Sequence, residues 1–139
     1  MYYRLDPEVA GHFGPETIVD SSTHPPIVHS LHYVFDGWLG DELLTAFPCF
    51  IVTKHMQQLI ESTNPSGCSF DAVTVSRSEQ FEELHSERQL PQFSRLMIDG
   101  VAQRDDFGTS ATGGSIVVSE RVLRVMKRGR LDHCEISAV

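Results

Sequence analysis

The stretch from Ile51 to Ile60, Ile-Val-Thr-Lys-His-Met-Gln-Gln-Leu-Ile, decides the fold because a strand pattern turns directly into a helix pattern within it. The β-branched pair at its start favours a strand, whereas Met56, Leu59 and Ile60 have the i, i+3, i+4 spacing of one helix face. Thr53 lies between the two patterns, where a hydroxyl side chain can cap the first turn of a helix. The stretch therefore predicts a strand that runs directly into a short amphipathic helix.

The same pattern recurs 66 positions later, where Val117-Val118-Ser119 precedes a second apolar stripe that includes Val122 and Met126. At this offset Cys68 aligns with Cys134, and each cysteine opens a further strand-like segment. We interpret the two stretches as an internal strand-helix-strand repeat, in which each helix packs on the strands that flank it.

The remaining segments complete one domain. A weaker helix is predicted from Ser78 to about Ser86, with Ser78 as its N-cap and Phe81 and Leu84 as its buried pair. No stretch reads as a linker, so residues 1–139 are expected to form a single α+β domain. Its architecture is predicted to be a mainly antiparallel sheet with two or three short helices packed on it. Strand-like segments lie at 27–35, 50–52, 70–75, 93–98, 116–118 and 134–138.

Composition indicates a soluble globular protein. The chain has 139 residues, of which 40% are hydrophobic and 22% charged. Its apolar runs fall far short of the ~20 residues that span a bilayer, and the first residues lack the apolar core of a signal peptide. Its three cysteines, Cys49, Cys68 and Cys134, have no CxxC spacing, which favours buried free thiols over disulfides or a zinc site. We expect a cytoplasmic protein.

Charge is unevenly distributed along the chain. Nineteen acidic and 11 basic residues give a net charge of −8, and residues 78–87 hold four glutamates and no lysine or arginine. A strongly acidic surface repels nucleic acid and suits a basic protein partner. Excess acid also serves solubility alone. Arg121, Arg124 and Arg128 share a helix face and suggest a nucleic-acid-binding regulator, but bases there commonly complement the helix dipole.

Histidines are the first candidates for metal chemistry. His24, His29 and His32 lie close together in the sequence, and His29 and His32 are three positions apart. On a helix that spacing would direct both side chains to one ligand, but the segment 27–35 reads as a strand, where the two would point to opposite sides. We expect no metal site and no cofactor.

A catalytic set is also missing from the sequence. The chain has no Gly-x-Ser-x-Gly elbow, no phosphate-binding glycine loop and no His-Glu-x-x-His. Asp105-Asp106-Phe107-Gly108 resembles a metal-binding Asp-Phe-Gly only superficially, because the other kinase signatures are absent. We expect no catalytic residues. A small enzyme that uses His32, Asp105 or Asp106 remains the alternative.

The segment Asp36-Gly37-Trp38-Leu39-Gly40-Asp41 surrounds the only tryptophan with two glycines and two acids, directly after an aromatic-rich strand pattern. A tryptophan in such a turn is either a plug in the core or an exposed anchor for a partner. The flanking acids and glycines keep the interface interpretation open.

Several strings of the sequence resemble a family of bacterial immunity proteins that was first catalogued as a domain of unknown function and later assigned to polymorphic toxin systems. The resemblance runs from about Tyr2 to Ile136. It implies a non-enzymatic inhibitor, encoded beside a secreted or injected toxin that is often a nuclease. The family brings no established functional residues that could be placed on this sequence. The strings are LHYVFDGWLGD at 31–41, FPCFIVT at 47–53, DDFG at 105–108, VVSERVL at 117–123 and LDHC at 131–134.

The expected partner is therefore a cognate toxin, most simply a basic one, bound by direct stoichiometric contact. Complementary charge would speed its encounter with an acidic inhibitor. A small cytoplasmic enzyme that disarms the toxin or its product is the alternative, and it would protect in substoichiometric amounts. Our candidate contact residues are Asp36, Trp38, Asp41, Glu42, Glu79, Glu82 and Glu83.

Overall fold

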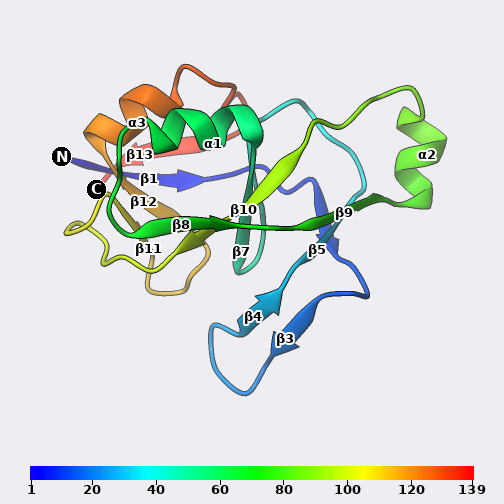
Figure 1. The fold of residues 1–139 in the computed structure, drawn as a ribbon, viewed down its shortest axis with the longest axis horizontal. Helices are drawn as coiled ribbons and strands as arrows, with labels where there is room; N and C mark the ends of the chain where they lie inside the picture. Colours follow the sequence, from blue (N-terminus) through cyan, green and yellow to red (C-terminus); the bar gives the residue numbers. More distant parts are fainter.

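Strand, cap and helix follow one another in both predicted copies of the repeat. In the computed structural model, which describes residues 1–139, β7 (Cys49–Thr53) runs into α1 (Lys54–Glu61) and β12 (Ile116–Ser119) runs into α3 (Glu120–Met126). Each helix has the expected N-cap residue and buries its apolar stripe, and α1 and α3 pack against each other (Figure 1). The predicted strand-helix-strand repeat is confirmed.

Each copy is completed into a four-stranded antiparallel sheet, and the two sheets have the same strand order. The first is β6-β7-β10-β8 and the second is β11-β12-β1-β13. The third strand of the second sheet is β1, which opens the chain, whereas β10 lies within the first copy's own sequence. The added strands are β1 (Tyr2–Asp6), β6 (Leu43–Ala46), β8 (Cys68–Asp71), β10 (Phe93–Ile98), β11 (Phe107–Thr109) and β13 (Glu135–Ala138).

Register shows that the two sheets match residue by residue. Thr53, the cap of α1, faces Phe93 of β10, and Ser119, the cap of α3, faces Tyr2 of β1. The chain thus contains two copies of one unit. The order of the strands along the second copy is circularly permuted, because β1 comes first in the sequence whereas its counterpart β10 comes last in the first copy. From these caps outward, Arg95 and Leu96 face Ile51 and Phe50, just as Arg4 and Leu5 face Val117 and Ile116.

Two insertions build the rest of the molecule: one precedes the first copy and the other interrupts it. One joins β1 to β6 and the other joins β8 to β10, and together they form the small sheet β2-β5-β9 and the helix α2. In Figure 1 the hairpin β3–β4 projects from the body and α2 lies far from α1 and α3. All strand pairs are antiparallel except β5 with β9. The inserted elements are β2 (Gly11–Phe13), β3 (Ile18–Asp20), β4 (Ile27–Ser30), β5 (His32–Phe35), β9 (Thr74–Arg77) and α2 (Glu79–His85).

The first sheet is buried on both faces, because alternate side chains of a strand point to opposite sides. Phe50 and Val52 of β7 join α1, α3 and the second sheet in one core cluster. Cys49 and Ile51 join the inserted elements in a second cluster, with Phe81 of α2. The inserted elements therefore cover the outer face of the first sheet.

Four details of the sequence-based prediction are wrong. The segment 27–35 is two strands separated at Leu31, because β4 pairs with β3 while β5 pairs with β2 and β9. The segment 70–75 likewise divides between β8 and β9. Leu84 is 66% exposed, and Phe81 is the only residue of α2 that is buried. Of the free cysteines only Cys49 is buried.

None of the three helices has the length and apolar character that crossing a membrane requires.

Candidate partner-binding surface

The tryptophan turn and α2, far apart in the sequence, lie around one hollow of about 350 Å³. Asp36 to Leu39 form one wall, Gln80 and His85 of α2 form another, and Glu8 and Val9 contribute from the segment after β1. We call this hollow and the exposed side of α2 the acidic surface.

Three contacts hold α2 in place. The backbone N–H of Ser78 donates to the carbonyl of Phe35, so that the helix begins beside the end of β5. Phe81 is fully buried, and the Arg77 guanidinium lies 4.7 Å from the centre of its ring. Arg77 also donates to Glu82 at 2.8 and 2.9 Å. The position of the acidic surface is therefore fixed by packing and by an ion pair.

Asp36 and Trp38 lie where a partner could reach them. Burial raises the pKa of Asp36, but hydrogen bonds with Ser78 and His12 outweigh it and hold that pKa below its usual range. Trp38 is half-buried: its Nε1 donates to the Asp41 carbonyl at 2.8 Å, and its ring packs edge-on to Phe93. Trp38 thus fills part of the core and also lines the hollow.

Asp41 is completely buried, so its assignment as a contact residue is wrong. Its carboxylate accepts from the backbone N–H groups of Asp132 and His133 at 3.1 and 2.8 Å. Glu42 is likewise engaged: its oxygens accept from the Thr53 hydroxyl and the Arg130 N–H, and 12% of its side chain is exposed. Both acids hold the loop after α3 to the strand β6, a role that the turn sequence does not distinguish from surface exposure.

Glu79, Glu82 and Glu83 are all exposed on α2. Of the seven predicted residues, Asp36 and Trp38 thus line the hollow, while the three glutamates lie on the exposed side of the helix that forms its other wall, with Glu82 beside Arg77. Sequence reasoning missed the apolar members of the acidic surface, Val9 and Leu39, which are 70% and 57% exposed. The sequence contains a weak indication that Leu39 is exposed, because this apolar residue lies between a tryptophan and a glycine in a turn. Nothing in the sequence around Val9 indicated that it is exposed.

Glu8 forms the charged edge of the hollow. Its Oε2 accepts from the Leu39 N–H at 3.1 Å, while its Oε1 is buried without a hydrogen-bond partner. Burial is the main cause that raises the pKa of Glu8 above its usual range, and the nearby carboxylate of Asp41 adds to it.

One group of side chains has metal-ligand atoms within 4.8 Å of one another: Glu8, Asp41 and His133. Asp41 already accepts three hydrogen bonds there, two from backbone N–H groups and one from the His133 ring. These hydrogen bonds account for the close approach of the three side chains, because the Asp41 carboxylate holds the loop that carries His133. His24, His29 and His32 form no such group.

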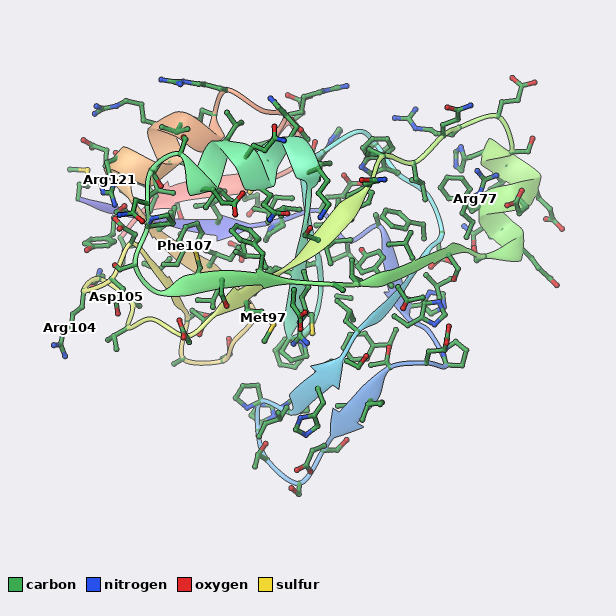
Figure 2. The ribbon with its side chains drawn as sticks, viewed as in Figure 1. Arg77, Met97, Arg104, Asp105, Phe107 and Arg121 are labelled. Carbon is green, nitrogen blue, oxygen red and sulfur yellow. The ribbon has the colours of Figure 1, made fainter.

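The residues named for the enzyme alternative lie in separate hydrogen-bond networks. His32 is buried and its Nε2 lies 2.7 Å from the Ser76 hydroxyl. Asp105 accepts from the Val101 N–H, and Asp106 pairs with Arg121 at 2.6 Å. In Figure 2 Asp105 and Arg121 lie at one end of the molecule and Arg77, beside α2, at the other.

The fold and the acidic surface define a small, duplicated α+β protein with one candidate binding face. No family model matches the chain, and neither a curated protein nor a solved structure matches it.

Proposed function

We propose that the chain is an immunity protein, which binds a cognate antibacterial toxin and neutralises it by direct stoichiometric contact. The motif resemblance supplies the class of partner. The observation that carries the proposal is the acidic surface itself, where exposed Val9 and Leu39 and half-buried Trp38 line a hollow beside α2, whose glutamates are exposed. Apolar and aromatic anchors within a polar rim are the usual anatomy of a protein interface.

The size of the protein is compatible with tight inhibition. A toxin that is silenced at low concentration requires roughly nanomolar affinity, about −12 kcal/mol. Such affinity needs about 800 Å² of contact on each partner. The chain exposes 7409 Å² in total, so one end of the molecule suffices.

The first experiment is affinity capture of the tagged chain in the organism that encodes it, followed by mass spectrometry. We expect one stoichiometric partner, encoded by a neighbouring gene and lethal when expressed alone. Capture of no partner while the neighbouring gene is expressed would contradict the proposal. Protection at far less than one copy per toxin would instead favour the enzyme.

Variants then locate the contact. Glu79→Lys combined with Glu83→Lys reverses two exposed charges of α2, and Leu39→Glu removes an apolar anchor. We expect each change to weaken toxin binding at least about tenfold, as interface anchors usually do. Glu61→Lys is the matched control, because Glu61 is an exposed acid at the end of α1, outside the acidic surface.

A further inference from the structure

Trp38 also lines a second hollow. Most of the ionisable side chains around this hollow are basic, whereas those of the acidic surface are mostly acidic. This second hollow has a volume of about 360 Å³ and is lined by Lys54 and His55 of α1 and by Arg130 from the loop after α3. Three basic side chains thus surround one space in a protein whose net charge is −8.

A fourth basic side chain, Arg88, reaches the same place. Its guanidinium lies 5.1 Å from the centre of the Trp38 ring. Gly40 has a φ of +107°, and a Cβ built on it would lie 3.0 Å from Nη1 of Arg130 and 3.5 Å from Nη2 of Arg88. Two guanidinium groups therefore converge above one glycine, where a side chain would displace them.

The facing donors of these two arginines are free. Arg130 donates to Asp132 through Nε and Nη2, which leaves Nη1 directed at the space above Gly40. Arg88 stacks on Trp38 and its side chain forms no hydrogen bond or ion pair.

No carboxylate in the wall is free to neutralise the pair. Glu42 lines the second hollow, but its oxygens already accept from the Thr53 hydroxyl, lie 2.7 Å from His55 Nδ1, and accept from the Arg130 N–H. Arg130 is paired with Asp132 on its other edge, at 2.9 Å, but Glu42 is the only carboxylate that lines the hollow itself. A bound anion would therefore still reduce the repulsion between the two facing guanidinium groups.

We propose that the second hollow is a binding site for a phosphate group, held between the guanidinium groups of Arg88 and Arg130. Planar guanidinium forks match the oxygens of phosphate and form strong, charge-assisted hydrogen bonds. The N–H groups at the start of α1 add a favourable dipole, and Lys54 adds charge. The volume exceeds that of a free phosphate, so the site can also accept the group that carries it. This inference does not depend on the proposed toxin partner.

Trp38 is the only tryptophan, so its fluorescence reports on the Arg88 stack directly. Inorganic phosphate and O-phosphoserine are titrated separately into the intact chain, with chloride at equal ionic strength as the reference. We expect a saturable change with at least one of the two phosphates and none with chloride. Calorimetry gives the affinity independently of the fluorescence baseline.

Arg88→Gln and Arg130→Gln each remove one guanidinium from an exposed position, so the fold is expected to survive; circular dichroism checks this. Each change should weaken phosphate binding at least about tenfold, because one charge-assisted contact is lost. Arg124→Gln is the control, since Arg124 is exposed on α3 and pairs with Glu120.

The absence of saturable binding of both phosphates would overturn the proposal. Binding that survives both arginine changes would overturn it as well, since it would show an adventitious ion only. Loss in both variants with retention in the control would establish the site, whatever the outcome of the toxin capture.

Discussion

At the level of single residues, acids that look alike in the sequence do different work. Asp41 is buried and satisfies two backbone N–H groups of the loop after α3, whereas Glu79 and Glu83 are exposed. Asp41→Ala would remove the acceptor of both N–H groups, at a cost of about 2–3 kcal/mol. We expect that loss in urea unfolding, and no comparable loss for Glu83→Ala. Equal stability of the two variants would contradict the role we assign to Asp41.

Glu42 and Asp106 occupy equivalent places in the two copies of the repeat. Each precedes the first strand of its sheet and accepts a hydrogen bond from the N-cap hydroxyl, Thr53 or Ser119, at 2.8 and 2.7 Å. Each also contacts a side chain in the first turn of the helix, His55 or Arg121. The duplicated unit therefore includes a carboxylate that holds its first strand to its helix.

This pair predicts a loss of stability in acid. Burial raises the pKa of both carboxyls, but hydrogen bonds from Arg130 to Glu42 and from Arg121 to Asp106, with others, lower each pKa below its ordinary value of 4.5 or 3.8. A lowered folded-state pKa stabilises the protein above the ordinary value, and this contribution is lost as pH falls through the folded-state pKa. We therefore expect the melting temperature to decrease once the pH is lowered past about 4. Glu42→Gln combined with Asp106→Asn should make the acid side of that profile shallower, and an unchanged profile would contradict the assignment.

At the level of elements, the two helix caps are equivalent in position and unequal in chemistry. The Thr53 hydroxyl accepts from the Met56 N–H at 3.0 Å, whereas the Ser119 side chain makes no capping hydrogen bond. Both hydroxyls donate to their carboxylates. Thr53→Ala should therefore destabilise the protein by about 1–2 kcal/mol, and Ser119→Ala by less. Chemical denaturation of both variants measures the difference, and the reverse order would contradict it.

Elements could be predicted from the sequence where their pattern is local. A strand, a hydroxyl and an apolar stripe are adjacent in the chain, so the 51–60 stretch and its copy revealed both helices and the repeat. The match between β1 and β10 could not be predicted, because the short strands share only an arginine followed by a leucine, Arg4-Leu5 and Arg95-Leu96, and their equivalence rests on distant pairing partners.

The candidate surface was predictable only in part, for the same reason. The acids of α2 and the tryptophan turn stand out by composition. The burial of Asp41 depends on a loop that arrives from the far end of the chain. The place of Val9 in the hollow depends on the position of α2 and the turn, which no pattern near Val9 encodes.

Phe81 is the only buried side chain of helix α2 and the main apolar contact between this helix and the body. Phe81→Ala should cost about 3–4 kcal/mol and loosen α2, while Leu84→Ala at the exposed position should cost less than about 0.5 kcal/mol. Hydrogen exchange at α2 amides measures the loosening, with α1 amides as the internal reference. Equal protection of α2 in both variants would show that other contacts hold the helix.

At the level of the whole molecule, a duplicated frame and its insertions have separate roles. Arg95 and Arg4 are equivalent, yet Arg95 is 8% exposed and donates to the Val28 carbonyl of the inserted hairpin, while Arg4 is exposed and pairs with Asp6. The insertions thus cover one copy and leave the other bare. They also supply most of the acidic surface, including α2 and the tryptophan turn. The frame provides stability and the insertions provide the candidate binding face.

The permuted order of the frame leads to a prediction about the chain as a whole. Val139 donates to the carbonyl of Tyr2 at 3.0 Å, and the two termini lie side by side in Figure 1. A short glycine linker can therefore join them, and a cut between Gln103 and Arg104, both exposed, restores two copies in the same order. Termini placed in exposed turns are usually tolerated. We expect this permutant to fold cooperatively, at a cost of about 2 kcal/mol for the lost turn. A permutant cut between Val52 and Thr53, inside the buried strand β7, should not fold, and if both behave alike the frame is not the unit that we describe.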